Sequence, residues 1–164
     1  MRRFLKFFLF LLSVVILSSC YDSVVEPDNQ FVQIFFKYGF RNELNTFENT
    51  YQKDLVQDGT IKITFWLTTE EQNRILQKVN EINFFSFPDE FGPDSSFISI
   101  APDPGPQKLS IKYNGRDKTV IWYYPLNYSD PDAVSLKEIN NLIISIIESK
   151  PEYKKLPPAN GRYI

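Results

Sequence analysis

Hydrophobic and polar residues alternate along the first half of the chain in the way expected of strands. The alternation is regular over residues 31–38, where Gln33 and Lys37 fall on the opposite face from the apolar positions. This pattern is typical of a strand with one buried face. We predict a second strand over residues 44–56 and a third over residues 61–67. The predicted inward residues are Val32, Ile34, Phe36 and Tyr38 in the first strand, and Phe47, Tyr51 and Leu55 in the second.

Two later segments place apolar residues at the three- and four-residue spacing of a helix. Thr68 and Glu71 form a capping box at the start of the first helix, which we expect to end near residue 83. Asp130 suits the cap of the second helix, and Pro131 suits its first turn. The predicted buried stripes are Ile75, Leu76, Val79 and Ile82 in the first helix, and Leu136, Ile139, Ile143, Ile146 and Ile147 in the second.

A hairpin is predicted between the two helices, with its turn at Asn114-Gly115. A two-residue turn places Ile111 opposite Lys118, whereas a four-residue loop places Ile111 opposite Val120. Because strand register follows the buried face, the matching of apolar residues favours the longer loop. The two strands are predicted over residues 107–113 and 118–124.

The predicted element order is β-β-β-α-β-β-α, with tight turns between consecutive strands. This order predicts an α+β fold, a two-layer sandwich in which an antiparallel sheet carries two helices on one face. We assign residues 31–150 to this single domain and residues 151–164 to a C-terminal tail. Residues 86–107 form a long connection, rich in proline and acidic residues, with a short edge strand over residues 97–100. Loops of this length in compact domains are usually functional or disordered.

The chain begins with a targeting signal. Three basic residues precede an apolar run over residues 7–17, and two serines follow it. This arrangement is typical of a secretory signal peptide over residues 1–19. The apolar run is shorter than the roughly 20 residues that a transmembrane helix needs. Residues 20–30 then form a polar tether.

The segment Leu17-Ser18-Ser19-Cys20 resembles the lipobox of bacterial lipoproteins, which lies directly behind such an apolar run. The resemblance implies a diacylglyceryl thioether on the Cys20 sulfur and cleavage between Ser19 and Cys20. It places the protein in the bacterial cell envelope, bound to the membrane through its lipid. Two or three acyl chains, at about 0.8 kcal/mol per buried CH₂, anchor a protein stably. Cys20 is the only cysteine, so the fold has no disulfide.

The composition narrows the chemistry further, because the chain has no histidine. Serine and cysteine triads and the cysteine–histidine zinc sites all need an imidazole, so they are excluded. Without its leader the chain holds 15 basic and 20 acidic residues and no dense basic patch, which argues against nucleic acid as a partner. We therefore expect no enzymatic activity, no cofactor and no metal.

Three short motifs carry a second resemblance. They are L-T-T-E-E at residues 67–71, I-N-F-F-S at residues 82–86 and N-G-R-D-K-T-V at residues 114–120. Together they resemble a class of small bacterial lipoprotein domains of unknown function and, more distantly, the emfourin-type protease inhibitors. The resemblance covers residues 60–150 and implies a fold that pairs hairpin and helix twice. It implies no catalytic residue, and residues 39–58 lie outside it.

Two groups of carboxylates are candidates for chemistry. Glu48 and Asp54 could act as acid and base, as in glycoside hydrolysis, although any chain with 20 acidic residues offers such pairs. A second group in the long connection lacks the spacing of a calcium loop, and we interpret it as a solvated loop. Its members are Asp89, Glu90, Asp94 and Asp103.

Aromatic side chains are the stronger candidates for binding. Trp66 has the outward orientation in its strand, and Tyr123 lies on the face opposite Val120. Exposed rings on the uncovered face of the sheet could bind a glycan or a partner protein, unless the long connection or the tail covers them. The candidate ligand-binding residues are Trp66, Trp122, Tyr123, Tyr124 and Tyr128.

Three functions stay open from the sequence. The first is a membrane-anchored lipoprotein with a non-catalytic binding or inhibitor-like domain, and we prefer it. The second is a carbohydrate-binding envelope lipoprotein, with Trp66 and Tyr123 exposed side by side. The third is a carboxylate-dependent hydrolase, which requires two acids about 5–10 Å apart in a pocket.

Cys20→Ala is expected to abolish incorporation of radiolabelled palmitate and to release or misprocess the protein, because it removes the acylated sulfur. The domain should stay folded, since Cys20 lies outside the predicted core. Palmitate labelling followed by membrane fractionation measures the effect, with Ser18→Ala as a control that keeps the sulfur. Label that persists in Cys20→Ala would contradict the anchor.

Overall fold

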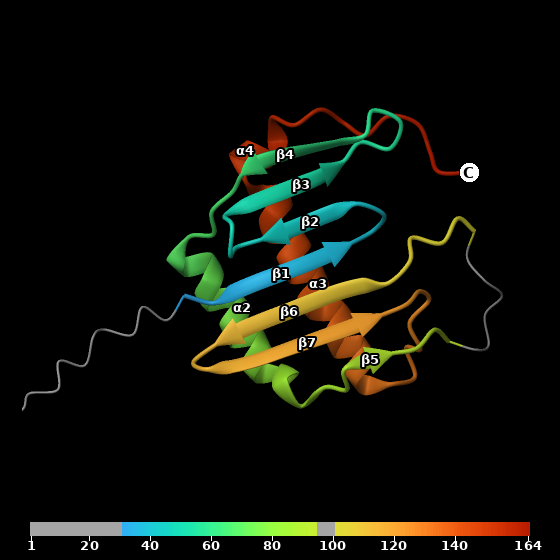
Figure 1. Ribbon diagram of the computed structural model, residues 1–164. Helices are drawn as coiled ribbons and strands as arrows, with labels where there is room; N and C mark the ends of the chain where they lie inside the picture. Colours follow the sequence, from blue (N-terminus) through green and yellow to red (C-terminus); the bar gives the residue numbers. More distant parts are fainter. Residues whose placement is uncertain (1–30, 95–100) are drawn as a thin grey trace, which may run out of the picture.

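The computed structural model describes residues 31–94 and 101–164, so the leader, Cys20, the tether and the strand predicted at residues 97–100 lie outside the described residues. The described chain forms a seven-stranded sheet in the order β4-β3-β2-β1-β6-β7-β5 (Figure 1). The strands are β1 (Gln33–Tyr38), β2 (Asn42–Asn45), β3 (Thr50–Asp54), β4 (Thr60–Thr64), β5 (Glu90–Phe91), β6 (Gln107–Tyr113) and β7 (Arg116–Trp122). The helices are α2 (Thr69–Glu81), α3 (Pro131–Ser149) and α4 (Pro151–Lys154), and a 3₁₀ turn, η1, spans Phe84–Ser86.

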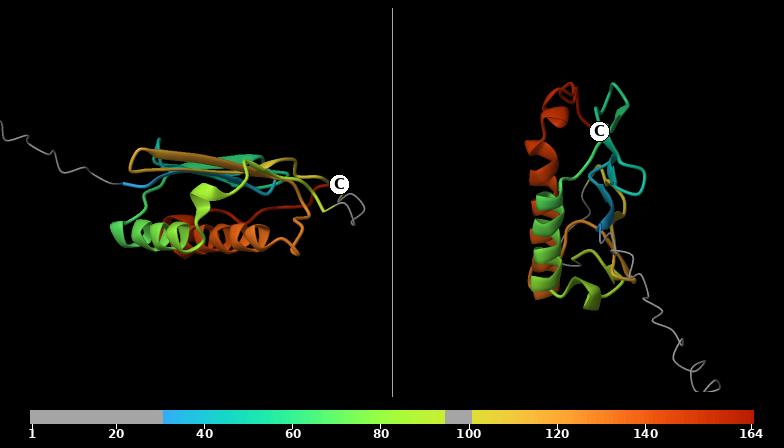
Figure 2. Two further views of the ribbon diagram at one scale, coloured as in Figure 1. Left: turned by 90° about the horizontal axis from the view of Figure 1, so that it is seen from below. Right: turned by 90° about the vertical axis from the view of Figure 1, so that its left-hand side faces the viewer.

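The molecule has two layers, because α2 and α3 cover the same face of the sheet (Figure 2). This arrangement confirms the predicted α+β fold. Ile34, Phe36 and Leu109 point from the sheet into the core, as the alternation predicted. Among the described residues, no helix combines the length and the apolar composition needed to cross a bilayer. The buried residues of the two helices are Ile75, Leu76, Val79, Ala133, Leu136, Ile139, Asn140, Ile143, Ile146 and Ile147.

The first half of the chain has four strands before its helix rather than the three that the alternation predicted. The backbone amides of Phe47 and Glu48 donate hydrogen bonds of 3.1 and 3.3 Å to Asn45 Oδ1. Such local side-chain contacts compete with strand extension, and here they close a turn. The single strand predicted over residues 44–56 is therefore the β2–β3 hairpin.

The β6–β7 hairpin has a two-residue turn, so the predicted four-residue loop is wrong. Asn114 and Gly115 have φ values of 49° and 71°, the left-handed conformation that both central residues of a type I′ turn require. Ile111 consequently pairs with Lys118. Both registers keep the same residues on the buried face, since they differ by an even number of residues, and the turn geometry decides between them.

Part of the proline-rich connection forms a strand that the alternation of residues does not predict. β5 pairs in parallel with β7, and the Ile121 amide donates a 2.9 Å hydrogen bond to the Asp89 carbonyl. This short strand completes the sheet beyond β7.

The C-terminal tail folds back onto the sheet. The ring of Tyr163 stacks on Phe40, with the ring centroids 3.7 Å apart. Its hydroxyl donates a 2.7 Å hydrogen bond to Asp54 and accepts one of 2.9 Å from Arg41. Arg41 and Asp54 also form an ion pair at 3.2 Å, so three side chains fix the end of the chain beside β3.

A polar contact joins α2 to α3. Glu71 and Thr68 form the predicted capping box, in which each side chain accepts a hydrogen bond from the other residue's backbone amide, at 2.8 and 3.2 Å. Lys150 Nζ donates a further bond of 2.8 Å to Glu71. Burial raises the pKa of Glu71, but the hydrogen bonds from Lys150 and Thr68 lower it, and the net pKa lies below its ordinary value of 4.5. The pair fastens the start of α2 to the end of α3.

Glu71→Gln is expected to lower the free energy of unfolding by about 1 kcal/mol at neutral pH, because the amide retains the cap but loses the ion pair. A carboxyl whose pKa is lowered by folding stabilises the protein above its unfolded-state pKa, and this stabilisation is lost as the pH falls through its folded-state pKa. The stability difference between wild type and variant should therefore shrink as the pH falls below 4.5. Urea denaturation at a series of pH values measures it.

Glu70→Gln is the matched control, because Glu70 is exposed in the same turn of α2 and leaves the ion pair intact. The free energies of unfolding of wild type and Glu71→Gln could instead differ by the same amount down to about pH 3, below the usual carboxyl pKa. That result would contradict a stabilising ion pair between Glu71 and Lys150.

Candidate functional site

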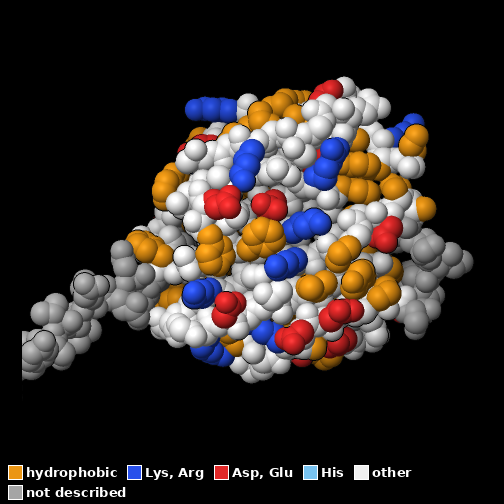
Figure 3. Space-filling model, viewed as in Figure 1, with side chains coloured by type: hydrophobic (Ala, Val, Ile, Leu, Met, Phe, Trp, Pro, Cys, Tyr) orange, Lys and Arg blue, Asp and Glu red, His pale blue; other side chains and the backbone are white. Residues whose placement is uncertain are grey.

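The open face of the sheet, opposite α2 and α3, carries mixed charges rather than an aromatic platform. Figure 3 shows lysine and arginine side chains interspersed with acidic and hydrophobic ones across this face. Trp66 follows β4 and Tyr123 follows β7, and four strands separate β4 from β7 in the sheet. The expectation that Trp66 and Tyr123 lie side by side is therefore wrong, because the four-stranded first half carries Trp66 to the far edge.

The remaining aromatic candidates are dispersed. Trp122 is 0% exposed, and its ring centroid lies 6.3 Å from that of Phe36. Its proposed role in ligand binding is therefore wrong, since a ligand cannot reach a ring in the core. Tyr124 is partly buried and Tyr128 is exposed, and both line a pocket beside α3 that is distinct from the surroundings of Trp66.

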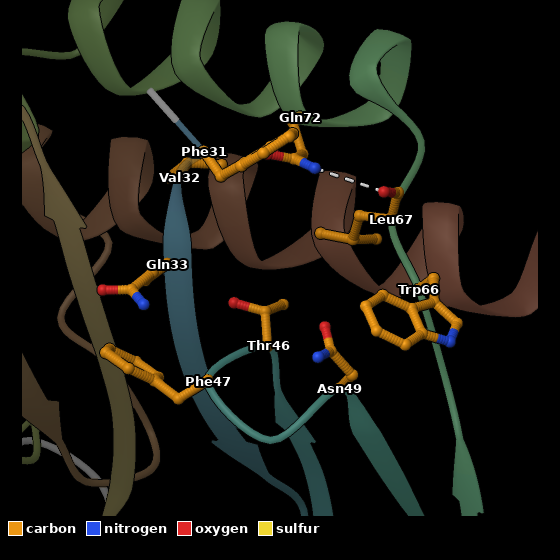
Figure 4. Close-up of a pocket in the computed structure, with 9 residues that line it drawn as sticks. All are labelled: Phe31, Val32, Gln33, Thr46, Phe47, Asn49, Trp66, Leu67 and Gln72. Atoms are coloured by element: carbon orange, nitrogen blue, oxygen red, sulfur yellow. Dashed lines mark hydrogen bonds between the residues drawn. The ribbon is translucent and has the colours of Figure 1, made fainter. Parts of the chain in front are cut away.

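Trp66 lines a pocket of about 350 Å³ at the end of the sheet where β1 begins (Figure 4). Four segments meet there: the start of β1, the β2–β3 turn, the connection from β4 to α2, and the first turns of α2. We call it the aromatic pocket. Its lining residues are Phe31, Val32, Gln33, Thr46, Phe47, Asn49, Trp66, Leu67 and Gln72.

Three large aromatic side chains of this pocket are exposed to solvent: Trp66 at 62%, Phe31 at 52% and Phe47 at 47%. Figure 4 shows Trp66 and Phe47 on opposite sides of Thr46 and Asn49. Burial of apolar surface is worth roughly 25 cal/mol per Å². Three rings held in water around one hollow therefore form a candidate contact surface.

Hydrogen bonds fix the backbone around the aromatic pocket. The Ile34 amide donates a 2.7 Å bond to Thr46 Oγ1, and the Thr46 amide donates one of 2.9 Å to the Ile34 carbonyl, which holds the β2–β3 turn against β1. Gln72 Nε2 donates a 3.2 Å bond to the Leu67 carbonyl, drawn as a dashed line in Figure 4. A site whose walls are already ordered loses less conformational entropy when it binds a ligand.

The polar groups of the aromatic pocket carry no charge. Gln33, Asn49 and Gln72 supply amides, and Thr46 supplies a hydroxyl. The side-chain amides of Gln33 and Asn49 make no hydrogen bond with the described residues, which leaves them available to a ligand. Apolar walls with a few convergent polar groups are typical of small-molecule sites. The described lining contains no lysine, arginine or carboxylate, and this favours a neutral ligand.

The carboxylate candidates are engaged elsewhere. Asp54 pairs with Arg41, and Glu48 pairs with Lys62 at 3.2 Å on the open face. Asp89 of the long connection pairs with Lys118. In the part of the chain that the structure describes, no group of three or more acidic or cysteine side chains is placed to hold a metal ion.

The outward parity of Trp66 predicts it as a binding residue, but the alternation of the sequence does not predict Phe31 and Phe47 as its neighbours. The alternation predicts Phe47 on the inward side of a strand, and this is wrong, because Phe47 lies at the tip of the β2–β3 hairpin. Asn45 and Asn49 flank this tip, and two asparagines so close together are a turn signal that could have located it.

No protein-family model matches the chain, and no curated protein matches it.

The two tryptophans are expected to respond differently to acrylamide, because Trp66 is exposed and Trp122 is buried. Trp66→Phe should remove most of the quenchable fluorescence and move the remaining emission to shorter wavelength. The free energy of unfolding of the Trp66→Phe variant should differ from that of the wild type by no more than about 0.5 kcal/mol, as is usual for surface positions. Emission from Trp66→Phe that is quenched as strongly as that of the wild type would show that Trp122 is accessible.

Proposed function

We propose that this protein is a lipid-anchored, non-catalytic binding protein of the bacterial cell envelope, and that its aromatic pocket binds a neutral saccharide. One observation carries the choice of ligand: three exposed aromatic rings and several uncharged amides surround a single pocket. The anchor rests on the leader and on the lipobox-like segment that ends at Cys20.

The chemistry of a sugar matches both kinds of group in the pocket. The C–H bonds on a sugar face carry slight positive charge and pack against the negative face of an aromatic ring. Sugar hydroxyls donate and accept hydrogen bonds, as the side-chain amides of Gln33 and Asn49 also do. A volume of about 350 Å³ lies at the small end of ligand sites, which suits one or two sugar units.

The position of the pocket is consistent with a ligand close to the membrane. Phe31 begins the described domain, directly after the predicted tether. Ten residues, 21–30, extend at most roughly 36 Å. A lipid on Cys20 would therefore hold the aromatic pocket near the membrane and the glycans that border it. Since the pocket has no carboxylate, we propose binding without hydrolysis.

A second function, binding of an extended peptide from another envelope protein, is favoured by the edge of the sheet. β4 is the terminal strand, and its side chains Thr60, Lys62 and Thr64 are exposed. An edge strand can accept a peptide as an additional strand. Protection of the β4 amides from hydrogen exchange in an envelope extract, but not with saccharides, would favour this function.

Saccharide binding is tested with the full-length chain in a detergent without sugar groups, titrated with N,N′-diacetylchitobiose and with maltose. We expect saturable binding of at least one disaccharide, accompanied by a shift of tryptophan emission. Trp66→Ala should weaken binding by about tenfold or more, in line with the 1–3 kcal/mol typical of one stacking ring. Gln33→Met, which keeps the length of the side chain and removes its amide, should also weaken binding.

Tyr123→Ala is the matched control, since it removes an aromatic side chain that follows β7, far from the aromatic pocket. Binding that Trp66→Ala leaves unchanged, or no binding of either neutral disaccharide, would overturn this assignment of the pocket.

A further inference from the structure

A second pocket, of about 260 Å³, lies between the sheet and the middle of α3. Side chains of β1, of the segment that follows β7 and of α3 form its walls, and we call it the α3 pocket. Its polar and aromatic lining residues are Tyr38, Tyr124, Tyr128, Lys137, Asn140 and Asn141, and the rest of its described lining is apolar.

Asn140 occupies an unusual position in this pocket. It belongs to the buried stripe of α3, which otherwise consists of alanine, leucine and isoleucine, and it is only 6% exposed. Its Oδ1 atom is buried and accepts no hydrogen bond from the described residues. An unpaired buried acceptor costs about 1–3 kcal/mol. A leucine would avoid this cost, so the amide is better explained by a ligand that donates a hydrogen bond.

The charge at the rim of the α3 pocket is positive. Lys137 is the one charged residue of its lining, and no ion pair joins Lys137 to another described residue. The Lys137 ammonium lies 4.4 Å from the centroid of the exposed Tyr128 ring. The neighbouring acid on the helix, Glu138, is engaged with Lys78. The described lining holds no carboxylate, and the acid that acts on Tyr38, Glu148, lies outside it near the end of α3. An anionic group would therefore find Lys137 as its nearest charged partner in the lining.

We infer that the α3 pocket binds an acidic monosaccharide unit, a sugar ring that carries one carboxylate. The carboxylate pairs with Lys137, a sugar hydroxyl donates to Asn140 Oδ1, and one face of the ring packs on the tyrosines. A purely apolar carboxylate would not satisfy Asn140, whereas a sugar supplies hydroxyl donors. This site is separate from the aromatic pocket and differs from it in charge.

The inference is tested by saturation-transfer NMR of the full-length chain, in a detergent without sugar groups, with sodium glucuronate as the probe and glucose as its neutral counterpart. We expect saturable binding of glucuronate at least about tenfold tighter than that of glucose, the difference expected for one charge-assisted contact. Lys137→Gln should remove this preference, and Lys155→Gln, at an exposed position beyond α4, should retain it.

Asn140→Leu separates a ligand contact from simple packing. If Asn140 contacts the sugar, the variant has a higher melting temperature and binds glucuronate about tenfold more weakly. A higher melting temperature with unchanged binding would overturn the assignment.

Trp66→Ala must leave glucuronate binding intact, so that failure of this inference is distinguishable from failure of the aromatic pocket. Absence of saturable glucuronate binding, equal affinity for glucose, or equal affinity for phenylacetate, a carboxylate without hydroxyl groups, would each overturn the proposal.

Discussion

Burial of one sheet face beneath α2 and α3 is the interaction on which the rest of the structure depends. The chain has a single cysteine, outside the described residues, so no disulfide supports the domain. Stability must come from apolar contact, and the largest buried side chains, among them Trp122, Tyr51 and Phe36, lie on this one face. Each ring removes about 150–250 Å² from water. The exposed aromatic residues, Trp66 and Phe47 among them, lie outside this core.

Both candidate binding sites lie at the margins of the helical layer. Two helices cannot cover a seven-stranded sheet completely, and hollows remain where the covering ends. The aromatic pocket opens beside the first turns of α2, and the α3 pocket opens between α3 and the ends of β1 and β7. The open face of the sheet carries mixed charges instead. Recognition is therefore proposed at the places where the two layers separate, not on the flat surface of the sheet.

The fold class and the helices could be predicted from the sequence because each rests on a strong local signal. The spacing of apolar residues in α2 and α3, with Thr68 and Asp130 as caps, fixes those helices almost by itself. The boundaries and register of the strands are harder to predict, because residues in the turns determine them and the alternation of apolar residues does not. Asn45 closes a hairpin inside an apparently continuous strand, and Asn114 sets a register against the matching of apolar residues.

The candidate sites could be predicted only in part. Trp66 was found from its outward parity, but its partners Phe31 and Phe47 come from other segments, which meet only once strand order is known. Asn140 gave no signal in the sequence, since one polar residue on an apolar stripe becomes informative only when its lack of a partner is seen.

The position of β1 determines how the domain would bear mechanical force. β1 is the first strand of the described residues, yet it lies in the interior of the sheet, paired over four residues with β2 and over five with β6. Antiparallel hydrogen bonds lie perpendicular to the strands. A pull along β1 from a lipid at the N-terminus would thus shear both ladders at once, whereas an edge strand at that point could peel away one bond at a time. If the chain carries the proposed lipid, this interior position of β1 would make the domain resist unfolding when it is pulled from its N-terminus.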